Sequence, residues 1–374
     1  MNSAHLFCPN IDCPARGQIG KGNISIHSQK DRRYKCDECQ ETFTATKGTI
    51  FYRLRTDPQI VMQVITLQAY GCPIQAIVQA FGLDERTVQD WWERAGTHCQ
   101  KVHEYKVEQA QLDLQQVQAD EIKVKTFMGT VWMALAIMVS TRLWLGGAVS
   151  PHRDMELIQT LANQIRNLAL CRPLLLAVDG LASYVTAFRK AFRTALPRRK
   201  GELGRPQLIS WPNIVIVQVV KQRLDGKLNV SRRIVQGSET MVTSLIQKTQ
   251  GEGVINTAFI ERFNATFRQR LNCLARRTRT LARKAQTLET GMYVVGCLYN
   301  FCHPHHSLRL KLSVGRFGHH WVQRTPAIAA GLADHIWTSE ELFYFRIPPT
   351  RWKPPIQRGR RSLATQELIE KWCS

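Results

Sequence analysis

Residues 174–180 read LLLAVDG, a short apolar run that stops at an acid and a glycine. An uninterrupted apolar stretch of this length, Leu174 to Val178, is typical of a central strand that is buried on both faces. Asp179 then stands where the strand ends. An acid in that place is either a turn residue or a ligand that faces a site. The sequence on both sides of the run indicates which kind of sheet holds it.

The segment before the run has the pattern of an antiparallel meander followed by a helix. Residues 117–127 alternate in polarity, and residues 131–140 and 142–149 continue as two further strands. Residues 154–170 then have helical spacing. We therefore expect three antiparallel strands and one helix ahead of the buried strand.

The segment after the run predicts a helix, two strands and later helices. The helix covers residues 181–196, and strands at 213–221 and 227–236 meet at Asp225-Gly226, a hairpin signal. This order of elements favours a mixed α/β domain of the RNase-H-like kind over residues 117–306. With the segments that precede it, the chain is expected to be an α+β protein of several domains.

The last predicted helix carries polar groups at fixed offsets. Residues 257–271, TAFIERFNATFRQRL, have an apolar stripe at helical spacing with Glu261 and Arg268 at its edge. Offsets of three and seven return to nearly the same side of a helix, so Asn264 projects beside them. Eight Lys or Arg and no acid lie between Arg262 and Lys284. A lone acid heading a basic run favours a metal ligand beside a phosphate backbone, with a solvated surface acid as the alternative.

Asp120, in the middle of the 117–127 strand, completes a set of three acids with Asp179 and Glu261. Its neighbour Glu121 is the alternative. Side chains alternate across a strand, so we expect only one of the two to be a ligand and favour Asp120. Three carboxylates can hold two Mg²⁺ or Mn²⁺ ions, which prefer hard oxygen ligands and catalyse in-line phosphoryl displacement.

Two short-spaced cysteine pairs near the start of the chain predict a zinc ribbon over residues 1–55. They are Cys8, Cys13, Cys36 and Cys39. Two such pairs suit a tetrahedral site that stabilises a small domain, with His5 and His27 as alternative ligands. The first residues lack a secretory signal, so we expect a cytoplasmic protein with reduced thiols, in which clustered cysteines bind metal.

Residues 56–100 have the pattern of a helix-turn-helix. The helical segments are residues 60–70, 74–81 and 85–95, the last capped by Asp84. Two helices joined by a short glycine-containing turn match a DNA-reading arrangement, with a helical spacer as the alternative. Arg86, Thr87 and Gln89 are expected to face the groove. The polar residues 101–116 are expected to link this part to the next domain.

The charge of the chain points to nucleic acid. The 374 residues include 51 Lys and Arg against 29 Asp and Glu, a net charge of +22, which favours a polyanionic partner. Residues 307–374 are expected to be a basic extension that binds DNA or is partly disordered. No membrane span is expected, because Ser140 to Arg142 interrupt the most apolar stretch. Further DNA contacts are expected at Arg32, Arg33, Arg276 and Arg277.

Several of these stretches resemble bacterial insertion-sequence transposases of the DDE class, most closely the insertion-sequence-one type and its relatives. The matching stretches are CPNIDCPARGQ, YKCDECQETF, QADEI, LLLAVDGLASY and FIERFNATFRQRLNCLARRT. The last is the most specific, because the family has an ERxN-type helix with a basic residue seven positions after the Glu. The resemblance implies that the active-site residues are Asp120, Asp179, Glu261, Asn264 and Arg268.

The resemblance implies an enzyme that binds the inverted repeats of an insertion sequence as a homo-oligomer on double-stranded DNA. It would cleave the element ends with Mg²⁺ or Mn²⁺ and join them to target DNA, with structural Zn²⁺ and no small-molecule cofactor. A zinc and helix-turn-helix transcription regulator, and an RNase-H-like nuclease without strand transfer, are the alternatives. Residues 299–305 also resemble a YN..RPH pattern with His303 in place of Arg, where His305 is a candidate phosphate contact or a plain helix end. Cys302, His303, His305 and His306 are a weaker candidate zinc site.

Overall fold

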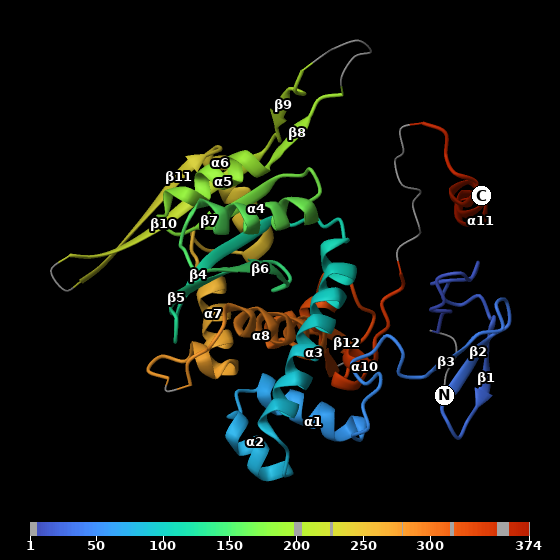
Figure 1. Cartoon of the computed structure of the whole chain (residues 1–374). Coiled ribbons are helices and arrows are strands. Elements are labelled where there is room, and N and C mark those ends of the chain that lie inside the picture. The colour runs from blue at the N-terminus through green and yellow to red at the C-terminus, as the bar shows by residue number, and fades with distance from the viewer. Residues whose placement is uncertain are drawn as a thin grey trace. The chain divides into compact units, whose positions relative to one another are not determined.

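The computed structural model describes residues 6–197, 204–224, 227–278, 280–314, 318–349 and 359–373. The chain divides into two compact units. One unit consists of Met1–Pro58 and Phe343–Ser374, and the other of Gln59–Leu342. Both helices and a mixed six-stranded sheet are present (Figure 1), so the predicted α+β class is confirmed. The predicted hairpin turn at Asp225-Gly226 and the alternative ligand His5 lie outside the described residues.

The first unit is built on a small antiparallel sheet in the order β1-β2-β3. Its elements are β1 (Ile24–Ser28), β2 (Arg33–Cys36), β3 (Thr42–Thr44) and the terminal helix α11 (Leu363–Cys373). Tyr344 packs on Phe51 with ring centroids 4.4 Å apart, and Arg346 donates to the carbonyl of Ala45. The predicted extension 307–374 is therefore divided between the two units, with the boundary before Phe343.

The second unit begins with three helices at the predicted positions. They are α1 (Pro58–Ala69), α2 (Ile74–Phe81) and α3 (Glu85–His103). Gly82 ends α2 with a φ of 62°, a left-handed conformation that suits glycine. The carboxylate of Asp84 then accepts from the backbone N–H of Arg86 at 2.8 Å and caps α3.

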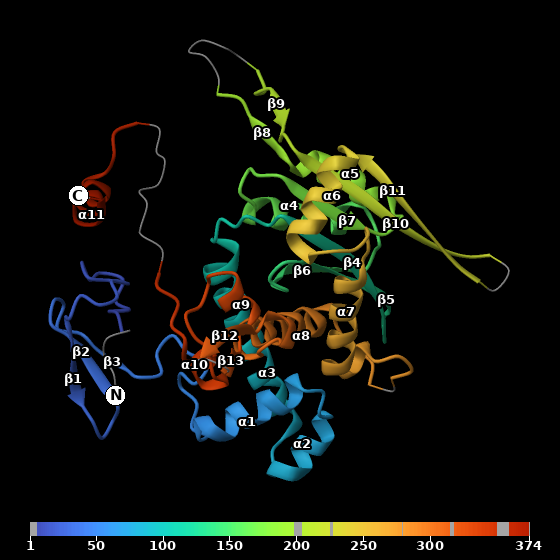
Figure 2. The ribbon, with the colours of Figure 1, turned by 180° about the vertical axis from the view of Figure 1, so that it is seen from behind.

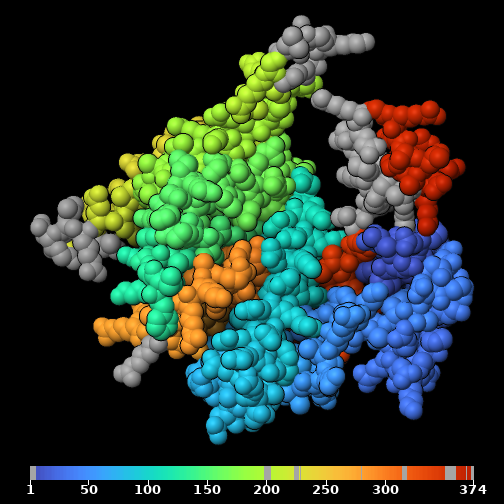
Figure 3. All heavy atoms as spheres, in the orientation of Figure 1, coloured from blue at the N-terminus to red at the C-terminus, as the bar shows by residue number. Residues whose placement is uncertain are grey.

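The first part of residues 101–116, the segment expected to link two domains, is helical. Helix α3 continues to His103 and passes into a π-helical turn, Glu104–Glu108, with Val102 and Val107 fully buried. Helix α3 packs against α8 (Ala285–Cys297), and the π-helical turn packs against α4 (Met155–Leu168). A Cβ on Gly96 would lie 2.4 Å from Cγ2 of Thr290, so the two helices approach closely only because Gly96 has no side chain. Figure 3 shows α8 (orange) between the light-blue helices and the green sheet.

The sheet of the second unit has the strand order β11-β10-β7-β4-β5-β6. Its strands are β4 (Gln116–Thr126), β5 (Gly129–Met138), β6 (Trp144–Ser150), β7 (Leu174–Val178), β10 (Ile214–Leu224) and β11 (Lys227–Gln236). The neighbours β4, β7 and β10 are parallel, whereas β5, β6 and β11 run antiparallel to their partners. The apolar run that forms β7 is buried along its whole length, as predicted.

Helices cover both faces of this sheet. They are α4 (Met155–Leu168), α5 (Ala182–Ala191), α6 (Glu239–Gln250) and α7 (Ala258–Arg270). Figures 1 and 2 show α4 and α6 on opposite sides of the sheet. Helix α6 packs Val242 and Leu245 against Leu175 and Val215 of the central strands. Burial of this apolar surface fixes the helices that lead into α7.

Helix α5 ends earlier than the predicted range 181–196. The chain leaves the helix at Phe192, whose carbonyl accepts from the backbone N–H of Trp211 at 2.9 Å. The short strands β8 (Arg193–Ala195) and β9 (Leu208–Ser210) then pair. The pairing of aromatic side chains, with the rings of Phe192 and Trp211 5.4 Å apart, overrides the local helical pattern.

Residues 306–342 add short elements to the second unit, after two helical turns that follow α7 and α8. The two helical turns are η2 (Asn272–Leu274) and η3 (Leu298–Cys302). The later elements are η4 (His306–Leu308), β12 (Leu310–Val314), β13 (Gly318–Val322), α9 (Pro326–Ala329) and α10 (Ser339–Tyr344), whose last two residues belong to the first unit. None of the helices in the described ranges has the length and apolar character that a bilayer crossing needs.

Candidate active site and metal centres

The four predicted zinc ligands converge in the first unit. Their sulfur atoms all lie within 4.8 Å of one another. Cys8 and Cys39 are 3.6 Å apart at sulfur, and Cys13 and Cys36 are 3.7 Å apart. A tetrahedral site with metal–sulfur bonds of about 2.3 Å separates its sulfurs by about 3.8 Å, so this spacing is that of a four-thiolate metal site.

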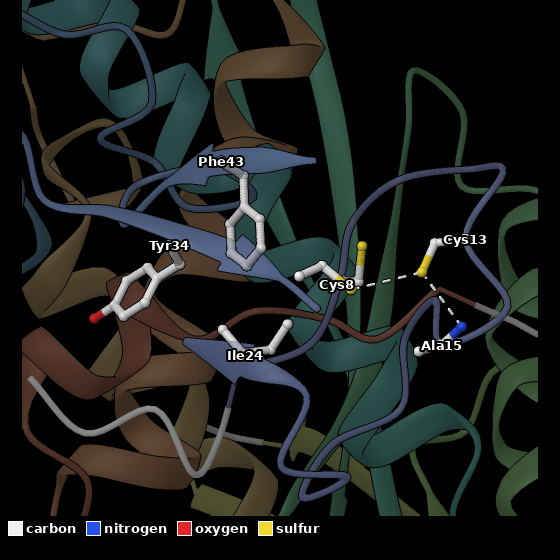
Figure 4. Packing of buried hydrophobic residues seen from close by; sticks show 7 residues of the cluster. Cys8, Cys13, Ala15, Ile24, Tyr34 and Phe43 are labelled. Atoms are coloured by element: carbon white, nitrogen blue, oxygen red, sulfur yellow. Dashed lines mark hydrogen bonds between the residues drawn. The ribbon is translucent and has the colours of Figure 1, made fainter. Parts of the chain in front are cut away.

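The surroundings of the cysteines favour thiolates bound to a cation. The backbone N–H of Ala15 donates to the sulfur of Cys13 at 3.3 Å, and the side-chain amide of Asn23 donates to the sulfur of Cys36 at 3.3 Å. Figure 4 shows Ala15 beside Cys13. Burial raises the pKa of Cys13 to about 11. A metal ion reverses this preference, because a coordinating thiol is deprotonated outright.

The predicted acids of the second unit line one cleft. Asp120 comes from β4, Asp179 follows β7 directly, and Glu261 lies in the first turn of α7. The cleft has a volume of about 620 Å³ and is also lined by Arg153 and Lys221. It opens at the end of β7, where parallel strands of a sheet bring their following residues together.

Asp120 is held by the predicted neighbour on α7. The side-chain amide of Asn264 donates to Oδ2 of Asp120 at 2.9 Å, and Asn264 is buried. Burial, followed by the charge of Glu121, raises the pKa of Asp120 to about 6. A bound cation would oppose this effect and favour the ionised carboxylate.

Glu121 also reaches this group, contrary to the expectation that strand alternation keeps it away. The two side chains do leave β4 on different faces, since Asp120 meets α7 while Glu121 meets Arg153, just ahead of α4. Strand β7 pairs with β4 only as far as Gln118, so the edge of β4 is open beyond that residue. One carboxylate oxygen from each of Asp120, Glu121 and Asp179 therefore lies within 4.8 Å of the others, a group that could hold a metal ion.

Glu121 is paired with a cation, Arg153, whereas Asp120 accepts from the neutral amide of Asn264. Arg153 donates from Nε to Oε1 of Glu121 at 3.1 Å and from Nη2 to Oε2 at 3.3 Å. The same Nη2 donates to Oδ2 of Asp179 at 3.0 Å. The side chain of Glu121 is fully enclosed, whereas that of Asp179 is 36% exposed. Glu121 therefore anchors Arg153, and Arg153 in turn orients Asp179 toward the cleft.

Glu261 lines the cleft but lies outside the close group of three acids. Its Oε1 is paired with Nζ of Lys221 on β10 and accepts from the hydroxyl of Thr257. The side chains of Glu261 and Lys221 are 45% and 41% exposed. The sequence did not single out Lys221 or Arg153, since neither lies in a motif.

Gln118 is a further residue that sequence reasoning missed. It is fully buried in β4, and its Oε1 accepts from the backbone N–H groups of Phe259 and Ile260 at 3.0 Å each. Its Nε2 donates to the carbonyl of Asn256 at 2.8 Å. These contacts hold the first turn of α7, and so Glu261, against the strand that carries Asp120. The sequence feature that could have identified Gln118 is its position two residues before Asp120, which places its polar side chain on the same face of the strand.

The predicted basic contacts have different surroundings. Burial and the charge of Arg276 lower the pKa of Arg268, an effect that the charge of Asp120 opposes. Arg33 donates to the hydroxyl of Thr42 at 2.5 Å and so braces the small sheet. Thr87 is half-buried on α3. The exposed members of the predicted set are Arg32, Arg86, Gln89, Arg276 and Arg277.

The histidines after α8 make contacts within the fold. Nε2 of His303 lies 2.7 Å from the guanidinium of Arg270, and its Nδ1 lies 3.2 Å from the hydroxyl of Tyr70. His305 lies 3.2 Å from the hydroxyl of Tyr299. Burial lowers the pKa of His303 to about 4. Among the described residues these histidines do not gather with Cys302 into a metal-binding group.

Comparison of the sequence with protein-family models and with curated proteins gives no match.

Proposed function

We propose that this chain is a DDE-type DNA transposase. It would bind the terminal inverted repeats of an insertion sequence, cleave the DNA ends and join them to target DNA. The observation that carries the proposal is the single cleft lined by Asp120, Asp179 and Glu261, from β4, the end of β7 and α7. The order of the elements adds support, because three antiparallel strands, a helix and a buried parallel strand ending in an acid are the features that predict an RNase-H-like domain.

The residues of the cleft fit magnesium or manganese. The candidate donors are all carboxylate oxygens, which suit hard cations and not soft ones. When bound by these carboxylates, two such ions would activate the attacking hydroxyl group or water and would stabilise the leaving oxygen. The chain's own residues prepare this arrangement. Asn264 fixes Asp120, Arg153 fixes Asp179, and Gln118 fixes the helix of Glu261.

The remaining parts of the chain would hold the DNA. The sulfur spacing of the cysteine centre fits Zn²⁺, which would stabilise the small sheet. On α3, Arg86 and Gln89 are exposed while Val88 and Trp91 are buried, so a polar face is free for a groove. The net charge of +22 favours contacts with phosphates. Because two DNA ends react together, we expect a homo-oligomer on the DNA.

The direct test is DNA cleavage and joining by the purified protein. The substrate is DNA that carries the inverted repeats flanking the coding sequence, incubated with Mg²⁺ or Mn²⁺. We expect cleavage at the element ends and joined products. We expect losses of at least about 100-fold in Asp120→Asn, Asp179→Asn and Glu261→Gln. Asp113→Asn is the matched control, because Asp113 precedes β4 and pairs with Arg172 at 3.3 Å outside the cleft.

Other results of this assay would indicate a different function. Binding of the repeats without cleavage would favour a zinc-dependent transcription regulator. Cleavage without joined products would favour an RNase-H-like nuclease. Full activity in the three acid variants would show that this cleft is not the active site.

A further inference from the structure

Lys221 lies just beyond the part of strand β10 that pairs with β7. The strand pairs with β7 only over Ile214–Gln218, opposite Leu174–Val178. Beyond that point β10 continues together with β11, and in Figures 1 and 2 this two-stranded ribbon extends away from the sheet. The first residues of the extension line the acidic cleft, and Lys221 is the basic one among them. The geometry of the sheet therefore presents an ammonium group to the cleft from the side opposite β4.

The two cations of the cleft are held in different ways. Arg153 is tied by two hydrogen bonds to the enclosed Glu121 and by a third to Asp179. Lys221 has its ion pair with Glu261, on a flexible stem, and both side chains are more than a third exposed. Exposed ion pairs contribute little to stability, so Lys221 can exchange its partner at small cost. Arg153 cannot leave without uncovering a buried carboxylate.

The charges of the cleft create a need for such an exchange. The carboxylates in and beside the cleft outnumber its cations, Arg153 and Lys221. The carboxylates are those of Asp120, Glu121, Asp179 and Glu261. An entering phosphate is therefore repelled unless positive charge is added. A divalent ion that binds Oε1 of Glu261 would displace the ammonium group of Lys221, which is paired with that oxygen. The freed ammonium group then lies beside the place where the phosphate must enter, and lysine binds phosphate as a compact point charge.

We propose that Lys221 is an exchange residue of the active site. It neutralises Glu261 in the metal-free protein and contacts a phosphate oxygen of the nucleic acid once metal ions hold Glu261. This inference rests on the proposed function, because it takes the cleft as a metal-dependent nucleic-acid site. It assigns Lys221 two opposite effects: competition with the metal and attraction of the DNA.

The test measures both effects on the full-length protein. In Lys221→Met, which keeps the length of the stem, we expect Mn²⁺ to bind the DNA-free protein about two- to fivefold more tightly, because a competing exposed ion pair is gone. With Ca²⁺ in place of the catalytic metal, we expect weaker binding of a DNA duplex. The slope of log affinity against log salt should also be smaller by about 0.9, the value for one phosphate contact. Lys221→Arg should restore the salt slope.

Lys248→Met is the matched control, because Lys248 is an exposed lysine in the last turn of α6. It should leave both affinities unchanged. A purely structural role of Lys221 predicts that metal and DNA binding fall together, and that result would overturn the inference. Unchanged Mn²⁺ affinity or an unchanged salt slope in Lys221→Met would also overturn the inference about Lys221. The proposed function would still stand in that case if the wild-type protein cleaves DNA. A wild-type protein that bound no Mn²⁺ would overturn both.

Discussion

Replacing Gln118 with methionine should loosen the helix that carries Glu261. The first N–H groups of a helix have no partner within the helix. In α7, the N–H groups of Phe259 and Ile260 are both satisfied by Oε1 of Gln118, at 3.0 Å each. The amide of Gln118 also donates to the carbonyl of Asn256 at 2.8 Å. Methionine fills a similar volume, so the variant removes these three hydrogen bonds with little change in packing.

The magnitude follows from the number of contacts and their burial. A hydrogen bond contributes about 0.5–1.5 kcal/mol net, and a buried group left without a partner costs about 1–3 kcal/mol. Three bonds at one fully buried side chain therefore correspond to a loss of about 3 kcal/mol in the free energy of unfolding. A displacement of about 1 Å at Glu261 lowers the rate of a positioned reaction by about 100-fold.

The assay needs a control that loses stability without disturbing α7. Gln116 provides it, because it is equally buried in β4 and its Oε1 accepts from Thr249 at 2.5 Å and from Gln250 at 2.9 Å, both on α6. Urea denaturation should show losses of similar size in Gln116→Met and Gln118→Met. DNA cleavage per folded molecule should fall in Gln118→Met alone. Equal cleavage by the two variants, or an unchanged free energy of unfolding in Gln118→Met, would refute the reasoning.

Three further predictions concern charge, metal and DNA. Burial and the charge of Glu121 raise the pKa of Asp120 to about 6, so the folded state loses stability as pH rises from about 4 to about 6, where the unfolded carboxyl ionises more readily. Without divalent metal, Asp120→Asn should therefore be more stable than wild type by about 1–3 kcal/mol at pH 7 and gain nothing at pH 3, by urea denaturation. Cys36→Ser should lose bound zinc and lower the thermal stability of the first unit, whereas Cys171→Ser, at an exposed cysteine, should keep its zinc by elemental analysis. Arg86→Ala, on the exposed face of α3, should weaken binding to the repeats by about 5- to 150-fold in a mobility-shift titration if it reads a base, and far less if α3 is only a spacer.

The strand and helix pattern near the site was predictable because local signals agree with the tertiary environment. Residues 174–178 and 227–236 form strands with the predicted bounds, and residues 74–81 form a helix with the predicted bounds. Each segment has a breaker at one end at least, such as Asp179 after the first and Gly82 after the helix. Breakers of this kind end an element whatever packs against it.

The polar segment after residue 100 was not predictable from its composition. Val102 and Val107 are nevertheless buried, and the helices that pack on this segment, α8 and α4, lie farther along the chain. Gly96 allows the close contact with Thr290 because it has no side chain. A glycine within a helical pattern does not by itself predict which segment will pack against it. Packing between segments far apart in the chain cannot be predicted from hydrophobic periodicity or from the charge pattern.

The acidic site shows the same division between local and distant information. Alternation correctly sends Asp120 and Glu121 to different faces of β4, yet it cannot say where the neighbouring strand ends. Because β7 stops pairing at Gln118, both acids reach the open edge. Arg153 then distinguishes the two acids, since it forms its ion pairs with Glu121 and Asp179 and not with Asp120. A carboxylate that is not already in an ion pair is the one that a metal ion would stabilise more, and this favours Asp120 over Glu121 as a metal ligand on physical grounds that the sequence alone did not contain.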